Sequence, residues 1–192
     1  MDRKEIREIS GYTFAKQQSR AESWYDSAAS FHEGANVLGL HKDSFPGGTR
    51  VFLTNAAQSI ELLLKAIIVA KSGIAPRTHR LLKLARDAGA PFSTSQEATL
   101  ELLGELLIWS GRYPVPNKAK DWDHYYDEVF ERHVNRVREG NAAMVLANRE
   151  TFPSVKNCEK LWDLANRRWE EILVTKQQST IGTTAEPSQR PE

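Results

Sequence analysis

The sequence predicts an all-α protein, an up-and-down bundle of about four to five main helices, since apolar residues recur every three or four positions in nearly every long segment. No run shows the alternation and the β-branched residues that are typical of strands. Glycine and proline fall between the periodic segments, where helices end. The length of 192 residues suits one domain with one main core.

Two long helices are predicted first. Apolar side chains at helical spacing predict an amphipathic helix over about 14–40, although the pattern is ragged at its start. These side chains belong to Phe14, Trp24, Ala28, Phe31, Ala35 and Leu38. A second helix is predicted over 49–73, where Gly73 and Pro76 end an almost continuous apolar pattern. We expect this second helix to be the most buried.

Capping signals mark two shorter helices. Thr78 is a residue type preferred at helix N-caps and predicts a short helix that Gly89 ends. Thr94 followed by Glu97 has the pattern of a capping box and predicts a further helix that stops at Gly111.

Two more helices complete the predicted bundle. A polar helix from about 121 to 147 has its apolar residues on one side, and Gly140 weakens it. The last helix starts at Ser154 and repeats Leu161, Ala165, Trp169 and Ile172 at helical spacing.

The predicted domain spans residues 14–175. It follows a short N-terminal segment, 1–13, and includes 117–153 as an insertion or an extended helix. Residues 176–192 are polar and contain proline, with too few apolar side chains to order themselves, so we expect a disordered tail.

Charge and cysteine content favour a soluble protein of the cytoplasm. The 26 basic and 25 acidic residues nearly cancel, so any basic site must be local. A single cysteine, Cys158, excludes an intrachain disulfide and suits a reducing compartment. The chain opens without a secretory or mitochondrial signal pattern, and its strongest apolar run, Leu62–Ala70, is shorter than the roughly 20 residues that span a bilayer. We expect no membrane association.

Familiar catalytic motifs are absent from the sequence. It has no Gly-rich phosphate loop, no Gly-x-Ser-x-Gly and no His-Glu-x-x-His. Four residues with metal-binding side chains share a helical spacing, namely His124, Asp127, Glu128 and Glu131. A metal site in a bundle also needs ligands from a second helix, and no second cluster supplies them, so we expect no metal and no other cofactor.

Glu61 and Lys65 are charged residues within the most apolar predicted helix. They lie one turn apart, in the order that favours an ion pair. Because buried charges need partners, they form either an internal pair at the edge of the core or a contact with a ligand.

A basic cluster surrounds the start of the third predicted helix. It consists of Arg77, His79, Arg80, Lys83 and Arg86. Guanidinium groups and helix N-terminal amides bind phosphate, which would make the cluster an anion site. The alternative is a solvated basic face with a locally bonded histidine.

Arg112 and Tyr113 form a polar and aromatic corner just past the end of the fourth predicted helix. The corner either contributes to the same anion site or is a packing feature, with the tyrosine tucked under Pro114.

In their order along the chain, these motifs resemble the HEPN superfamily, the higher eukaryote and prokaryote nucleotide-binding domain, over roughly residues 15–116. Three short motifs match the family's Glu-x-x-x-Lys, Thr-His and Arg-Tyr-Pro: Glu61 with Lys65, Thr78 with His79, and Arg112 with Tyr113 and Pro114. The resemblance implies a helical bundle that dimerises through its long helices. It also implies a setting among prokaryotic toxin–antitoxin pairs and defence systems.

The sequence departs from the family in two places. Many members are metal-independent ribonucleases with an Arg, four to six residues, then a His, and no arginine of this chain has a His five, six or seven positions downstream. Arg80 stands where relatives often carry an Asp after the Thr-His pair, which makes the local charge more basic.

The resemblance without the nuclease signature favours a non-catalytic module that binds nucleotide, RNA or a protein partner. A divergent metal-independent ribonuclease that uses His79 and Arg112 is the second hypothesis, because a base and a cation need not be adjacent in sequence. A structural partner in a heteromeric complex is the third. We also expect a homodimer, because Trp24, Phe31, Trp162 and Trp169 exceed what one modest core readily buries.

Overall fold

The computed structural model describes residues 1–139 and 142–183 and confirms the all-α helical bundle. Its α-helices are α1 (Arg3–Ser10), α2 (Phe14–Ser19), α3 (Ala21–His41), α4 (Gly48–Ser72), α5 (Leu81–Ala88), α6 (Thr94–Glu105), α7 (Ala119–Glu128) and α8 (Val155–Thr183). Two π-helical turns, η1 (Leu106–Ser110) and η2 (Val129–His133), extend α6 and α7. Strands β1 (Val134–Glu139) and β2 (Ala142–Ala147) form a small hairpin.

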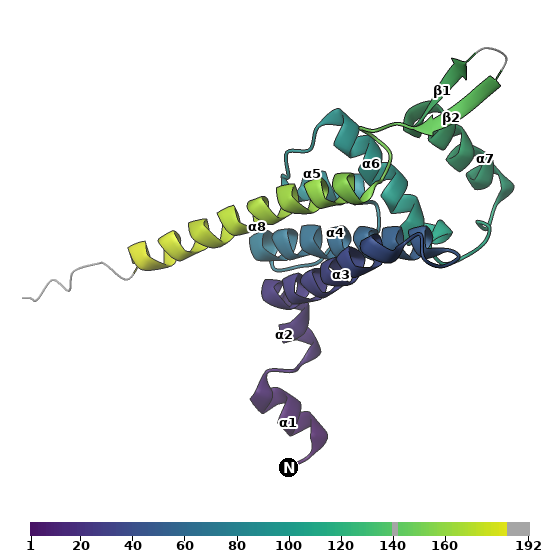
Figure 1. Cartoon of the computed structure of the whole chain (residues 1–192). Helices are drawn as coiled ribbons and strands as arrows, with labels where there is room; N and C mark the ends of the chain where they lie inside the picture. Colours follow the sequence, from purple (N-terminus) through teal and green to yellow (C-terminus); the bar gives the residue numbers. More distant parts are fainter. Residues whose placement is uncertain (140–141, 184–192) are drawn as a thin grey trace, which may run out of the picture.

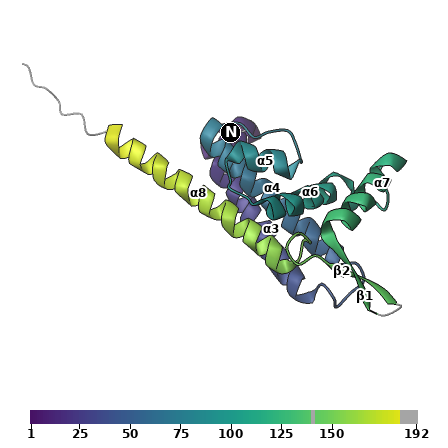
Figure 2. The same cartoon turned by 90° about the horizontal axis from the view of Figure 1, so that it is seen from above.

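Helix α4 is the centre of the bundle, as predicted for residues 49–73. Helix α3 runs alongside it, and α5, α6 and α8 also contact it (Figures 1 and 2). Its side chains are buried on nearly every side, including those of Ile60, Leu63, Leu64 and Ile67. Gly73, with φ of 76°, ends the helix in the left-handed conformation that glycine adopts most readily.

The apolar character of α4 follows from this central position. By length and composition it is the one helix among the described residues that could cross a membrane, with a mean hydropathy of 1.4. However, 72% of that apolar window is buried inside the bundle, as in the core helix of a globular protein.

The shorter helices exist as predicted, but their caps differ. Helix α5 begins at Leu81, and Thr78 forms a local turn instead, in which its hydroxyl accepts from the Arg80 amide at 3.2 Å. The capping box of α6 is one residue earlier than predicted and pairs Ser93 with Gln96. Serine with glutamine bonds the backbone amides of a helix start in the same way as threonine with glutamate does. The sequence pattern alone therefore does not determine which of the two neighbouring pairs caps the helix.

The predicted helix over 14–40 is interrupted at Arg20. Arg20 is extended, with ψ of 102°, and separates α2 from α3. The indole Nε1 of Trp24 donates to the Gln18 carbonyl at 3.1 Å, which stabilises this break. Helices α1 and α2 consequently project from the side of the bundle (Figure 1).

The predicted helix over 121–147 is wrong beyond residue 133. The helical part is α7 with η2, and an antiparallel hairpin follows in which Val134 pairs with Ala147 and Val137 with Met144. Val134 and Val137 fit a helical face, but β-branched residues also suit a strand, and a Gly-Asn pair typically joins hairpin strands. Residues 140–141 themselves lie outside the described residues.

Helix α8 continues to Thr183, beyond the expected domain boundary at 175. Its second half extends past the bundle in both views (Figures 1 and 2). The remainder of the expected disordered tail, 184–192, lies outside the described residues.

Two of the aromatic residues that favoured a homodimer are part of the core of a single chain. The indole of Trp162 is buried and stacks on His32 with ring centroids 4.0 Å apart. Trp169 is buried and stacks on Tyr25 at 5.1 Å. The surplus of aromatic surface is therefore smaller than predicted, and of the four residues only Trp24 and Phe31 still argue for self-association.

Candidate functional site

A buried carboxylate joins two of the predicted site residues. The side chain of Glu61 is 2% exposed, and its Oε1 lies 2.5 Å from Nζ of Lys65, whose side chain is 9% exposed. Nδ1 of His79 also lies within hydrogen-bond distance of this carboxylate, at 3.0 Å from Oε1 and 3.1 Å from Oε2. Of the two alternatives for Glu61 and Lys65, the internal ion pair is present, and His79 is a third member of it.

Local structure explains why His79 reaches this carboxylate. Glu61 and Lys65 lie one turn apart on α4, so their side chains share a face. After Gly73 ends the helix, the chain reverses, and the turn at Thr78 places His79 over Glu61. An ionised carboxylate only accepts, so His79 carries its proton on Nδ1 and leaves Nε2 available for a ligand.

These residues border an open groove of about 540 Å³. One wall is α2 with the start of α3, which contribute Phe14, Gln17, Gln18 and Trp24. The segment 75–79 and Lys65 also line the groove. Nζ of Lys65 lies 5.9 Å from the ring centroid of Trp24. The groove therefore combines aromatic rings, amides and cations within one space.

Within the part of the chain that the structure describes, Arg77 is the cation of the groove that has no protein partner. Among the described residues, neither Arg77 nor Arg80 has a side-chain hydrogen bond or ion pair, and both are exposed. Lys65 is different, because Glu61 neutralises it. Of the predicted basic cluster, Arg77 and His79 line the groove, while Lys83 pairs with Asp87 at 2.5 Å.

Arg112 and Tyr113 lie apart from this network. Nη2 of Arg112 donates to the carbonyls of Leu107 at 2.6 Å and Ile108 at 3.2 Å, and its guanidinium lies 5.8 Å from the Tyr113 ring centroid. No hydrogen bond or ion pair within the described part of the chain joins Arg112 to His79. Arg112 thus caps the end of η1, whereas Tyr113 is 55% exposed and is not packed into the corner as the packing alternative requires.

Sequence reasoning missed the aromatic wall of the groove. The sequence pattern predicts Trp24 in the core or at a dimer face, and Phe14 on the apolar side of a helix. Phe14 is 80% exposed, because α2 projects from the bundle. The ragged pattern before Trp24 was the available signal, since a helix without a regular apolar face is not fully packed.

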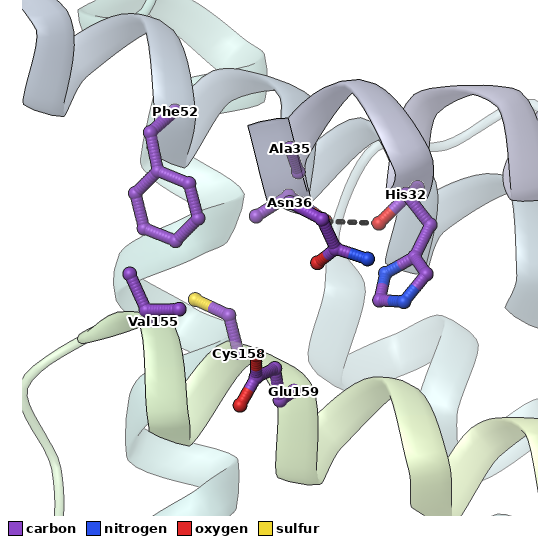
Figure 3. Close-up of a pocket in the computed structure, with 9 residues that line it drawn as sticks. His32, Ala35, Asn36, Phe52, Val155, Cys158 and Glu159 are labelled. Carbon is purple, nitrogen blue, oxygen red and sulfur yellow. Dashed lines mark hydrogen bonds between the residues drawn. The ribbon is translucent and has the colours of Figure 1, made fainter. Parts of the chain in front are cut away.

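A second cavity lies between α3, α4 and α8 and has a volume of only about 10 Å³. Figure 3 shows its lining, with His32 from α3, Phe52 from α4 and Cys158 from α8. This space is about that of a single water molecule. Burial raises the pKa of the Cys158 thiol to about 12, so the thiol is protonated near neutral pH and is a poor nucleophile.

Two further histidines lie away from the groove, His133 buried and His32 partly buried. His133 in η2 lies with Nδ1 2.9 Å from the Thr151 carbonyl, and burial lowers its pKa. Burial likewise lowers the pKa of His32 beside Trp162. Within residues 1–139 and 142–183, no group of three or more His, Cys, Asp or Glu side chains could hold a metal ion.

Residues 21–139 match the family model described as the HEPN domain. The matched range contains Trp24, Glu61, Lys65, Arg77 and His79, whereas α2 precedes it. No curated protein and no solved structure matches the chain.

Proposed function

This chain belongs to the HEPN domain family, and from that premise we propose that its groove binds a nucleotide or a short stretch of RNA without cleaving it. The observation that supports this most directly is the composition of the groove, which the rings of Phe14 and Trp24 line together with the exposed Arg77. Nucleotides combine a flat base with an anionic phosphate, and each part has a matching surface here.

The base would stack on an aromatic ring and the phosphate would meet Arg77. Single-stranded nucleic acid is commonly held by stacking on aromatic side chains beside positive charge. Among the described residues, no carboxylate forms an ion pair with Arg77, so its guanidinium N–H groups can donate to a phosphate. Lys65 contributes less, because Glu61 already offsets its charge.

Reversing the charge of Arg77 tests this proposal. Arg77→Glu should weaken binding of AMP or a fluorescein-labelled single-stranded RNA by roughly tenfold or more, since a hydrogen bond to a charged group contributes about 1.5–3 kcal/mol. Wild-type affinity should also fall between about 50 and 200 mM salt as counterions are released. Fluorescence anisotropy for RNA and calorimetry for AMP give both quantities.

Arg167→Glu is the matched control, because Arg167 is an exposed arginine of α8 outside the groove lining. Equal weakening by both reversals would indicate nonspecific attraction and contradict the groove. Trp24→Leu should add a loss of about 1–3 kcal/mol through the missing stack. If wild type shows no salt-sensitive binding at all, the third hypothesis, a structural partner such as the silent half of a toxin–antitoxin pair, becomes preferable.

A second candidate function is metal-independent RNA cleavage, and the contact between Glu61 and His79 favours it. A carboxylate on Nδ1 orients an imidazole and supports its use as a base. The cation would be Arg77 in place of Arg112, because Arg112 caps η1. Two facts favour binding alone: the sequence lacks the family's Arg-to-His spacing, and Arg77 and His79 lie only two positions apart.

Gel analysis of labelled RNA separates these functions. We expect the wild type to leave both single-stranded and structured RNA intact under conditions in which it binds them. Cleavage that disappears in His79→Ala, with binding retained, would contradict our proposal and establish the second candidate. Cleavage that persists in His79→Ala would point to a contaminating nuclease.

A further inference from the structure

The hairpin of β1 and β2 stands at one end of the molecule, beyond α7 and away from the bundle's centre (Figures 1 and 2). The described residues contain only this two-stranded sheet, so each strand has one edge without a strand partner. Its apolar side chains are substantially exposed, with Met144 at 42%, Val145 at 54% and Leu146 at 50%. A two-stranded hairpin is marginally stable in water, and a further strand would stabilise it.

The two free edges differ in charge. Strand β1 carries Arg136 and Arg138, whereas β2 has the sequence AAMVLA, without a charge or a proline. Lysine, charge and proline are the usual means by which proteins protect a sheet edge from pairing. The β1 edge therefore has such protection, and the β2 edge has none.

We propose that β2 pairs antiparallel with β2 of a second copy of this chain, which makes a four-stranded sheet across a two-fold axis. A second copy suits this edge because two uncharged strands meet without repulsion. Pairing through β1 would instead bring arginines of both copies together. Pairing of β2 with β1 of another copy would leave one free edge at each end. It would therefore form open chains of hairpins and not a closed dimer.

The register defines which side chains gather on each face. Arg136 lies opposite Val145 and Arg138 opposite Ala143, so these share one face, while Val137 and Met144 share the other. A two-fold axis normal to the sheet keeps corresponding faces on the same side. The dimer therefore joins the faces on which both copies carry Val137, Met144 and Leu146, beside Asn135, and it leaves the arginines of both β1 strands on the reverse face, at the outer strands.

Charge at Val145 tests this interface. Under the two-fold axis, residue 145 lies directly opposite or diagonally adjacent to its own copy, within about 5–8 Å. Val145→Glu and Val145→Lys should each weaken self-association by roughly fivefold or more through like-charge contact. An equimolar mixture should associate again, because opposite charges then meet. Sedimentation velocity, with 21.7 kDa as the mass of one chain, reports each state.

Two features keep the test independent of folding. Val145→Glu faces Arg136 in its own chain, so an unfolded hairpin cannot explain the loss of association in that variant. Asn135→Glu places the same charge on β1, one strand further from the proposed β2–β2 contact, and should leave association unchanged. Circular dichroism confirms that each variant retains the helical fold.

The contrary results are equally definite. A wild type that sediments as a single chain up to tens of micromolar would overturn the proposal. So would a dimer that is insensitive to both Val145 variants, since its interface would then lie elsewhere. Failure of the mixture to associate, with both variants monomeric and folded, would exclude the symmetric pairing of β2 strands.

Discussion

Glu61→Leu should destabilise the protein by about 3–5 kcal/mol, a large part of the 5–15 kcal/mol typical of a domain. Removing the carboxylate leaves the ammonium of Lys65 buried without its partner at 2.5 Å, and His79 loses its anchor as well. A buried charge without compensation costs far more than an exposed pair is worth. Urea denaturation followed by circular dichroism measures the difference.

The double variant Glu61→Leu with Lys65→Met is the decisive companion. It removes both charges and leaves apolar side chains of similar size, so its stability should lie much closer to the wild type. His79→Ala should cost little, because the His79 side chain is 58% exposed. If the single and double variants unfold at the same urea concentration, the loss reflects packing at position 61 and not an unpaired lysine.

Trp162→Ala should cost about 3–5 kcal/mol, the range for truncating a large buried aromatic residue. Trp162 is 8% exposed within a single chain and stacks on His32, so the loss creates a cavity between α3 and α8. The effect should not depend on protein concentration, because the indole belongs to one chain's core. Urea midpoints at two protein concentrations measure both points.

Trp122→Ala is the matched control. Trp122 is 36% exposed on α7, where it packs against Trp109 and Tyr126, so its truncation should cost clearly less. A concentration-dependent midpoint that disappears in Trp162→Ala would instead place Trp162 in a subunit interface and restore the original argument for a dimer.

The sequence predicted the helices best where burial is nearly complete. The almost continuous apolar pattern over 49–73 predicts a helix at the centre of a bundle, and Gly73 marks its end. At the hairpin the same reasoning failed, because Val134 and Val137 satisfy a helical spacing as well as a strand. Few tertiary contacts act on that segment, so local preference decided the outcome.

The candidate site was predictable in part. Helical spacing pairs Glu61 with Lys65, but His79 lies eighteen residues from Glu61 in sequence and joins the pair only because the chain reverses after α4, which no local rule specifies. The resemblance to a family singled out His79 without giving its partner. Phe14 and Trp24 enter the groove because Arg20 breaks the helix between them, a break that the side-chain pattern only suggested.

The buried imidazole of His133 makes the base of the hairpin sensitive to acid. Nδ1 contacts the Thr151 carbonyl, and the Thr151 hydroxyl donates to the Arg132 carbonyl, so one cluster ties the segments before β1 and after β2 together. Burial lowers the pKa of His133 below its ordinary value of about 6.5. At a pH below about 6.5, His133 therefore binds a proton more readily in the unfolded chain than in the folded chain. The contribution of His133 to stability is therefore complete above that pH and declines as the pH falls through it, which makes this junction a point where acidification loosens the protein.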